Sequence, residues 1–454
     1  MKKPELLLPA GTLKNMRYAY SYGADAVYAG QPRYSLRARN NDFTYENIAI
    51  GINDAHEQGK KFFLASNVIP HNSKIKTYMD DIAPIIELQP DALIMADPGL
   101  IMMVKERWPE AAIHLSVQAN TVNYAAVKFW HSVGVERVIL SRELSLDEIK
   151  EIRQQCPDME LEVFVHGALC IAYSGRCLLS GYFNHRDPNQ GTCTNACRWE
   201  YKVHDTKENV TGDIELLQPQ KIDFDPFSAM NSPEAFPDDR QMQRHPEADK
   251  TYLIEEAERP GEYMPIIEDE NGTYIMNSKD LRALEHVERL MQIGVDSLKI
   301  EGRTKSHYYA ARTAQVYRQA IDSLARGEAF DMELYADLKS LANRGYTDGF
   351  YQRHHTHEYQ NYMDNHSRSK SQQFVGEILE YNEAEQSALV DVKNRFAVGD
   401  TLELILPEGN KAFTLEAITS KKGEAMDVAP GSGHIVTIPL PFKADNYSLI
   451  ARNF

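Results

Sequence analysis

The sequence predicts an α/β protein with a (β/α)8, TIM-like barrel followed by a small all-β barrel. Eight short apolar runs alternate with helix-length amphipathic segments, and from Phe374 onward the pattern changes to period two. Near-continuous apolar runs are typical of parallel strands buried on both faces, and eight strand–helix units are the number that closes such a barrel. An open doubly wound sheet is the alternative, although no G-x-G-x-x-G motif follows the first run.

The eight predicted strands are separated by segments of helix length. LKNMRYAYSYG follows the first run, and LSLDEIKEIRQQ follows the sixth. The second segment begins at Ser145, with Glu148 three residues later, which is the spacing of a capping box. A helical stretch is expected from about 305 to 345. The apolar runs are ELLLPAG (5–11), ADAVYAG (24–30), KFFLASN (61–67), ALIMAD (92–97), IHLSVQAN (113–120), RVILSRE (137–143), LEVFVHG (161–167) and DSLKIEG (296–302).

A long insertion, 168–275, separates the seventh and eighth runs. Its first part contains four cysteines, and its later part, about 204–270, is acidic and rich in turn-forming residues, which indicates a loop or a partly ordered excursion. We therefore predict a barrel domain over 1–345 that contains this insertion and a linker over 346–373. A small β-barrel domain is expected over 374–454.

The charge of the chain is unevenly distributed. The formal net charge is −17, but the segment 205–270 holds 18 Asp and Glu against 6 Lys and Arg, a net charge of −12. The remaining chain is nearly balanced, so the charge does not exclude an RNA partner, and the acidic segment offers a surface for a protein partner. No apolar run reaches the roughly 18 residues of a membrane span, and no signal peptide is recognisable. We therefore expect a cytoplasmic protein with no membrane partner.

Four of the five cysteines lie close together at the start of the insertion. Their spacing is Cys-x6-Cys-x15-Cys-x3-Cys. Disulfides are rare in the cytoplasm, so the cluster favours a metal. Four thiolates at wide spacing suit a [4Fe–4S] cluster; zinc is the alternative, although zinc ribbons have shorter spacings, and four metal-free thiols are the third interpretation. The four residues are Cys170, Cys177, Cys193 and Cys197, whereas Cys156 is expected to be an ordinary structural thiol.

Polar side chains follow the predicted strands at the end where a barrel of this type holds its reacting groups. Each one alone is also consistent with a helix cap or a loop contact, whereas the set converges on one mouth. Arg176, Asn195 and Arg198 accompany the cysteines, where they would bind sulfur or an anionic substrate, or form surface ion pairs with the acidic segment. The residues at the strand ends are Tyr28, Gly30, Asn67, Asp97, Gln118, Asn120, Ser141, Arg142, Glu143, His166, Lys299, Glu301 and Arg303.

The motif around the first two cysteines resembles that of a known family. Glu162-Val-Phe164-x-x-Gly167-Ala168-Leu169-Cys170, followed by Gly175-x-Cys177-x-Leu179-Ser180, is similar to the signature of the collagenase-like U-type peptidase family number thirty-two. DAVYAG, the segment Arg33–Arg39 and SLKIEGR at 297–303 also resemble this family. Over essentially the whole chain, the sequence resembles its branch of prephenate-dependent tRNA uridine hydroxylation proteins.

The resemblance implies a tRNA-modifying enzyme with a [4Fe–4S] cluster on Cys170, Cys177, Cys193 and Cys197. Such proteins hydroxylate carbon 5 of the wobble uridine to 5-hydroxyuridine without molecular oxygen, with prephenate as co-substrate and the tRNA anticodon region as partner. In some relatives the last ligand comes from further along the chain. No cysteine follows Cys197 in this sequence. Either Cys197 is the fourth ligand, or the cluster has three protein ligands and one iron open to substrate.

Roles for the residues at the strand ends follow from this resemblance. A uridine must leave its stack to be modified, and Tyr28 would stack on it. His166, Gln118 and Glu301 would complete the catalytic set, with His166 moving a proton. Prephenate carboxylates or RNA phosphates would bind to Arg142, Arg176, Asn195, Arg198, Lys299 and Arg303. The C-terminal β domain would hold the anticodon stem through Lys393, Arg395 and Lys411.

Two other functions remain alternatives from the sequence. The first is a collagenase-like peptidase, and the second is a binding or assembly module with a structural metal and no turnover. The sequence contains no H-E-x-x-H motif, no G-x-S-x-G motif and no Walker A loop. These absences disfavour the best-known hydrolase mechanisms.

Overall fold

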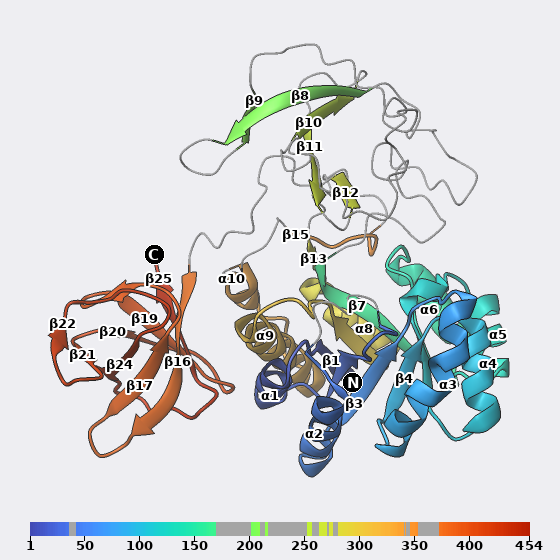
Figure 1. Cartoon of the computed structure of the whole chain (residues 1–454), viewed down its shortest axis with the longest axis horizontal. Coiled ribbons are helices and arrows are strands. Elements are labelled where there is room, and N and C mark those ends of the chain that lie inside the picture. The colour runs from blue at the N-terminus through green and yellow to red at the C-terminus, as the bar shows by residue number, and fades with distance from the viewer. Residues whose placement is uncertain are drawn as a thin grey trace, which may run out of the picture.

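Eight parallel strands form a closed barrel (Figure 1). The structure is a computed structural model that describes residues 1–35, 42–168, 201–208, 214–216, 252–256, 263–269, 272–275, 280–339, 341, 346–352 and 372–454. β14 pairs in parallel with both β1 and β7, so the strand order β14-β1-β2-β3-β4-β5-β6-β7 closes on itself. The predicted barrel is confirmed, with strands β1 (Glu5–Pro9), β2 (Ala26–Gly30), β3 (Lys61–Ser66), β4 (Ala92–Met95), β5 (Ile113–Leu115), β6 (Arg137–Ile139), β7 (Glu160–Ala168) and β14 (Ser297–Ile300).

Helices cover the outside of the barrel, and local capping signals begin several of them. Ser145 and Glu148 form the predicted capping box at the start of α6, and Thr12, Thr44 and Ser306 accept backbone N–H groups at the starts of α1, α2 and α9. The helices are α1 (Leu13–Ser21), α2 (Tyr45–Glu57), α3 (Asn72–Glu87), α4 (Pro98–Arg107), α5 (Tyr124–Ser132), α6 (Leu146–Gln155), α8 (Val287–Ile293), α9 (His307–Arg326) and α10 (Leu334–Lys339), with 3-10 turns η2 (Val117–Ala119) and η6 (Leu284–His286).

The chain between β7 and β14 forms strands where the sequence indicated a loop or partly ordered excursion. A five-stranded antiparallel sheet has the order β12-β11-β10-β8-β9. The chain then returns to the barrel through β13 (Asp280–Arg282), which pairs antiparallel with the end of β7 and in parallel with β15 (Tyr346–Thr347). The insertion strands are β8 (Tyr201–Glu208), β9 (Ile214–Leu216), β10 (Tyr252–Glu256), β11 (Tyr263–Asp269) and β12 (Gly272–Ile275).

The C-terminal segment is all-β, as predicted. Its eight-stranded antiparallel sheet has the order β20-β19-β25-β16-β17-β24-β21-β22 and curls into a half-barrel (Figure 1). Its own core contains Val375, Val390 and Leu402, which are fully buried. The strands are β16 (Gln372–Asn382), β17 (Ser387–Val392), β18 (Phe396–Ala397), β19 (Thr401–Ile405), β20 (Lys411–Thr414), β21 (Ile418–Ser420), β22 (Ala425–Met426), β23 (Val428–Ala429), β24 (Ile435–Pro439) and β25 (Leu449–Asn453).

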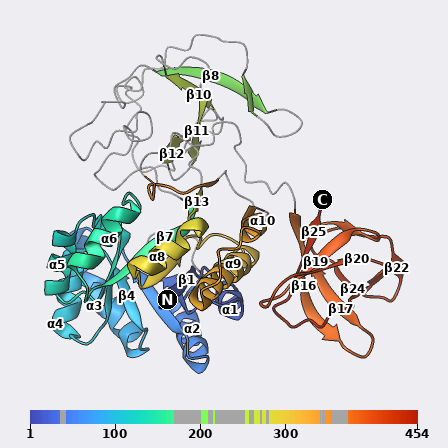
Figure 2. The ribbon, with the colours of Figure 1, turned by 180° about the vertical axis from the view of Figure 1, so that it is seen from behind.

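The half-barrel packs on the side of the barrel that carries α1 and α9 (Figure 2). The Tyr22 hydroxyl donates to the carbonyl oxygen of Ile405 at 2.8 Å, and the ring of Tyr308 stacks on Phe374 with centroids 4.7 Å apart. Ile405, Leu449 and Ala451 of the half-barrel are buried in the apolar core of the barrel, so the two parts pack directly against each other.

One carboxylate of the half-barrel is held by side chains from both parts of the chain. Glu377 on β16 is buried, and its oxygens lie 2.6 Å from Lys14 Nζ on α1, 3.1 Å from His307 Nε2 on α9 and 2.8 Å from Lys393 Nζ. Burial alone would raise the pKa of Glu377, but hydrogen bonds from His307, Lys14 and Lys393 hold it well below its ordinary value of 4.5. Glu377 is therefore ionised in the folded protein at neutral pH.

Replacing Glu377 with Gln is expected to lower the free energy of unfolding by about 2 kcal/mol at pH 7, because Lys14 and Lys393 lose their shared carboxylate. The folded pKa is lowered, so this stabilisation is full above 4.5 and is lost as the pH falls below that value. Urea unfolding of the Glu377→Gln protein and the unchanged protein at several pH values measures the difference. Glu383→Gln is the control, since Glu383 is exposed and lies 4.0 Å from Lys443. An equal effect of the two substitutions would contradict the argument.

Candidate active site at the barrel mouth

Residues from two strands meet at the carboxyl end of the barrel. The hydroxyl of Tyr28, on β2, lies 3.1 Å from the carboxylate of Glu301 and 3.1 Å from the carbonyl oxygen of Ile300. The ammonium of Lys299, on β14, lies 4.3 Å from the centre of the Tyr28 ring. β1 separates these strands in the sheet, so the contacts form across the lumen, where alternate residues of each strand point inward.

Two arginines join this group. A guanidinium nitrogen of Arg142 lies 3.9 Å from the same Glu301 carboxylate, and its Cζ lies 3.7 Å from the centre of the Phe164 ring on β7. Arg303 Cζ lies 5.9 Å from the centre of the Tyr28 ring. The structure thus brings together Tyr28, Glu301 and the three predicted cations Arg142, Lys299 and Arg303. The mouth thus carries three cationic side chains close to one carboxylate and one aromatic ring.

Two glycines at this mouth allow neighbouring atoms to lie close to the backbone. A Cβ at Gly30 would lie 2.7 Å from Arg303 Nη1 and 2.5 Å from Ser35 Oγ. Gly167 has φ +102°, and a Cβ there would lie 2.3 Å from the carbonyl oxygen of Glu301. The amide of Glu301 donates to the carbonyl oxygen of His166 at 2.8 Å, so the ends of β7 and β14 are held in contact.

A buried ion network lies below Tyr28 in the lumen. Lys299 Nζ donates to Glu162 Oε1 on β7 at 2.8 Å, and Arg137 Nη1 on β6 donates to Glu162 Oε2 at 3.1 Å. Glu162 is fully buried and Lys299 nearly so. Burial lowers the pKa of Lys299, and the neighbouring Glu162 carboxylate opposes that shift. Each charge is therefore neutralised by a direct partner rather than by water.

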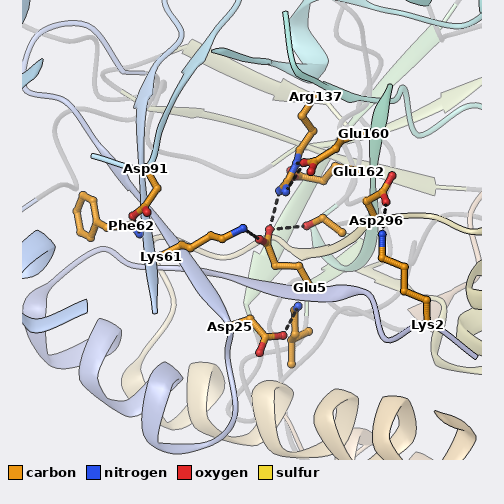
Figure 3. A network of polar contacts seen from close by, with 12 residues as sticks. Lys2, Glu5, Asp25, Lys61, Phe62, Asp91, Arg137, Glu160, Glu162 and Asp296 are labelled. Atoms are coloured by element: carbon orange, nitrogen blue, oxygen red, sulfur yellow. Dashed lines mark hydrogen bonds and ion pairs between the residues drawn. The ribbon is translucent and has the colours of Figure 1, made fainter. Parts of the chain in front are cut away.

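The network continues to the amino-terminal end of the barrel. Arg137 also lies 2.6 Å from Glu5 on β1 and 2.7 Å from Glu160, and Lys61 lies 3.2 Å from Glu5 (Figure 3). Burial would raise the pKa of Glu5, but Arg137 and Lys61 lower it. Charged residues thus connect the bottom of the lumen to Lys299 near the mouth.

His166 is buried among aromatic rings at the end of β7. Its ring centre lies 5.9 Å from Tyr309, 5.6 Å from Tyr317 and 5.5 Å from Tyr346. Burial, together with the positive charges of Arg282 and Lys305, lowers the pKa of His166 to about 3. At neutral pH the imidazole is therefore uncharged. It carries no acidic proton to donate, and it can hold an added proton only transiently.

Other predicted residues at the strand ends mainly contact one another or cap helices. Asp97 accepts the Leu100 amide at 2.9 Å and caps α4. The hydroxyl of Ser116 bridges Gln118 and Asn67, at 3.4 Å from each side chain. Within the described part of the chain, Gln118 thus belongs to a separate amide cluster. Asn120 has φ +52° after η2, and the Ser141 hydroxyl donates to the carboxylate of Glu143.

Seven predicted site residues lie outside the described residues, so their placement stays a prediction. They are Cys170, Arg176, Cys177, Cys193, Asn195, Cys197 and Arg198. Cys156 is described: it is buried, its thiol contacts the Tyr124 carbonyl oxygen at 3.5 Å, and burial raises its pKa, which fits the predicted structural thiol. Within the described ranges, no helix has the length and apolar character that a bilayer span requires.

Three buried residues of the lumen were not among the predicted site residues. Glu162 and Arg137 belong to the ion network, and His114 on β5 is uncharged because burial, then Arg137 and Lys299, lower its pKa well below the ordinary value. The His114 ring packs against Phe63, with centroids 4.6 Å apart. The sequence does carry a signal for these residues, because each is a charged or titratable residue inside an apolar run. Such residues are rarely buried without a partner, so they indicate a paired group inside the barrel.

Comparison with known proteins agrees with the predicted family. The model described as "Peptidase family U32" matches residues 11–361, and that of its C-terminal domain matches residues 370–451. The chain belongs to peptidase family U32. This U32 chain is 60% identical to the tRNA hydroxylation protein P of Escherichia coli (strain K12), over 100% of the chain and 98% of that protein.

Two further relatives in the U32 family carry different functional names. The tRNA hydroxylation protein P of Haemophilus influenzae is 57% identical, over 99% of this chain and 96% of that protein. The collagenase of Porphyromonas gingivalis is 27% identical, over 76% of this chain and 73% of that protein. The family resemblance inferred from the cysteine motif is thus confirmed for the chain as a whole.

Replacing Lys299 with Met is expected to lower the free energy of unfolding of this U32 chain by about 3 kcal/mol, because the buried Glu162 loses its nearest cation. Chemical unfolding measures the change. Lys2→Met is the control: Lys2 is exposed and pairs with Asp296 at 3.0 Å, so a loss below about 0.5 kcal/mol is expected. If the two substitutions had similar effects, the buried pair would not stabilise the lumen as described.

Gly167→Ala is expected to destabilise the fold by about 3 kcal/mol, because its Cβ would collide with the Glu301 carbonyl oxygen in addition to the strain of positive φ. Gly294→Ala is the matched control. Gly294 has φ +86° with nothing within 4 Å of a built Cβ, so strain alone, about 1 kcal/mol, is expected. Thermal unfolding of both proteins tests the comparison, and equal losses would rule out the close approach at Gly167.

Proposed function

We propose that this chain hydroxylates carbon 5 of the wobble uridine in tRNA, giving 5-hydroxyuridine, with prephenate as co-substrate. One observation carries the proposal: the chain is 60% identical, from end to end, to a tRNA hydroxylation protein. The replacement of C5–H by C5–OH is a two-electron oxidation of the base. The proposal therefore requires a redox group in addition to the side chains of the mouth.

The cysteines supply a donor set for that group. Four thiolates suit a [4Fe–4S] cluster, with zinc as the alternative occupant. The first of them, Cys170, comes two residues after Ala168, the last residue of β7, and β7 ends at the mouth beside Glu301. The donor set thus fits an iron–sulfur cluster held by Cys170, Cys177, Cys193 and Cys197. When bound, the cluster would carry the electrons of the oxidation.

The cations of the mouth fit the anionic partners in this proposal. Prephenate carries two carboxylates, and tRNA carries a phosphate at each nucleotide. Arg142 lies beside Glu301, and Lys299 and Arg303 lie beside the Tyr28 ring, so positively charged side chains line the place where such groups would bind. In the proposed complex, Arg142 and Arg303 hold the prephenate carboxylates, and the Tyr28 ring faces the flipped uracil.

The described geometry narrows the roles of the other proposed catalytic residues. His166 is uncharged at neutral pH, so we assign it to positioning the end of β7 rather than to donating a proton. Glu301 accepts from Tyr28 and lies beside Arg142, so it orients both groups. Gln118, with Asn67 and Ser116, offers amide groups for a base edge on a neighbouring part of the rim.

The half-barrel is the proposed site for the anticodon stem. Lys393 is held by Glu377 and Asp391 of the same half-barrel, both within 2.8 Å, so its charge is already paired. Lys411 lies 5.4 Å from the centre of the Phe442 ring. Arg395 and Lys411 are therefore the better candidates for phosphate contacts.

A peptidase activity, suggested by the family description and the collagenase relative, has less support. Among the contacts between described residues, no serine, threonine or cysteine side chain is hydrogen-bonded to a histidine. Such a nucleophile–base pair is the usual requirement of covalent peptide hydrolysis. Hydrolysis of gelatin by the purified protein is the direct test of this second function.

The decisive experiment is nucleoside analysis of tRNA from a bacterial strain that lacks the gene. We expect 5-hydroxyuridine and its derivatives to disappear and to return with the unchanged gene. Cys170→Ala is expected to fail, because a cluster ligand is lost, whereas Cys156→Ala is the control and is expected to restore the nucleoside. Unaltered tRNA nucleosides in the deletion strain would overturn the proposal.

A further inference from the structure

Two acidic residues and a histidine converge on one side of β13, and none of the three has a role in the proposed reaction. Glu285 and His286 belong to η6, which follows β13, and Asp348 follows β15. β13 and β15 run in parallel and pair with each other, so the chain leaves both strands at the same edge. The ligand atoms of Glu285, His286 and Asp348 all lie within 4.8 Å of one another.

The distances match the edges of a metal coordination shell. His286 Nε2 lies 3.3 Å from Glu285 Oε1 and 3.3 Å from Asp348 Oδ2. In a tetrahedral zinc site with bonds of about 2.0 to 2.1 Å, neighbouring ligand atoms are separated by about 3.3 to 3.4 Å. A charge-assisted N–H···O bond is shorter, about 2.7 to 2.9 Å. The observed spacing is therefore long for a hydrogen bond and suited to a shared cation.

A proton alone satisfies this arrangement poorly. The protonated imidazole has one hydrogen on Nε2, while two carboxylate oxygens lie at equal distance from it. The side-chain amide nitrogen of Gln352 lies 3.5 Å from the same Nε2, so two donors would face each other. With a cation between the groups, Nε2 is a lone-pair donor, and turning the amide places its oxygen toward the cation.

The surroundings hold the ligands in place. His286 is 5% exposed. The other oxygen of Glu285 accepts from the Tyr335 hydroxyl, and the His286 ring packs edge-on against Tyr351 at 5.6 Å. Such outer contacts orient the ligands of metal sites.

We propose that Glu285, His286 and Asp348 bind a divalent first-row cation, with zinc the best match to the spacing. A water molecule or the Gln352 amide oxygen completes the tetrahedron. The cation fastens the segment 346–352 to the start of α8. That segment reaches the mouth, because the Tyr351 hydroxyl donates to the carbonyl oxygen of Phe164, the residue whose ring lies under Arg142. The site is thus a positioning site for the wall of the mouth.

The test compares metal content in full-length proteins. The unchanged protein, Asp348→Asn and Glu285→Gln are stripped with a chelator, reconstituted with zinc without oxygen, desalted and analysed for zinc per chain. The control is His56→Gln, because among the described residues His56 pairs with a single carboxylate, Asp91, at 3.1 Å. Asp348→Asn and Glu285→Gln are each expected to hold one zinc per chain fewer than the unchanged protein. His56→Gln is expected to hold as much zinc as the unchanged protein. Circular dichroism confirms that all four are folded.

Cobalt spectra separate this site from the cysteines. The spectrum of the cobalt-loaded unchanged protein minus that of Asp348→Asn is expected to show only the weak visible bands of nitrogen and oxygen ligands. A thiolate charge-transfer band in the difference would mean that the lost metal was bound to cysteine, and would overturn the proposal. Equal zinc in all four proteins would also overturn it and leave an ordinary ion cluster. Neither result depends on whether the chain hydroxylates tRNA.

Discussion

The carboxylate of Glu162 is enclosed in a barrel that gives it no contact with water, and the lumen is organised around its neutralisation. Two cations from the strands on either side of β7, Arg137 on β6 and Lys299 on β14, reach the same carboxylate. Removing one member of such a group leaves an uncompensated charge, so the three residues depend on one another. Lys299 in turn lies under the Tyr28 ring, which links the neutralised interior to the residues of the mouth.

The barrel strands could be predicted because burial on both faces leaves a continuous apolar run. β13 and β15 could not, since neither DLR nor YT lies in a continuous apolar run. They form because β7 extends to Ala168, beyond its pairing with β14, and offers an edge to β13. The insertion strands lie in acidic sequence, where turn-forming residues mask a strand pattern. Pairing with distant partners, rather than local preference, determines these elements.

For the site, position along the chain was sufficient to find Tyr28, Lys299, Glu301, Arg142 and Arg303, because the carboxyl ends of barrel strands meet at one mouth. Their partners were not predictable: Glu162 and Lys299 are 137 residues apart, and no local pattern indicates that contact. The environment of His166 is another case. Its neighbours Tyr309, Tyr317 and Tyr346 come from α9 and β15, so its lowered pKa is a property of the fold rather than of its own segment.

The place of β14 in the sheet has a consequence for how the chain emerges from the ribosome. β14 is the eighth strand of the barrel, yet it is the one that joins β1 to β7. At a synthesis rate of about 10 residues per second, the 137 residues between Glu162 and Lys299 take on the order of ten seconds to appear. During that interval β1 and β7 present unpaired backbone groups, and Glu162 lacks its lysine. The growing chain therefore passes through a stage in which protection of these edges by chaperones matters more than it does for the finished barrel.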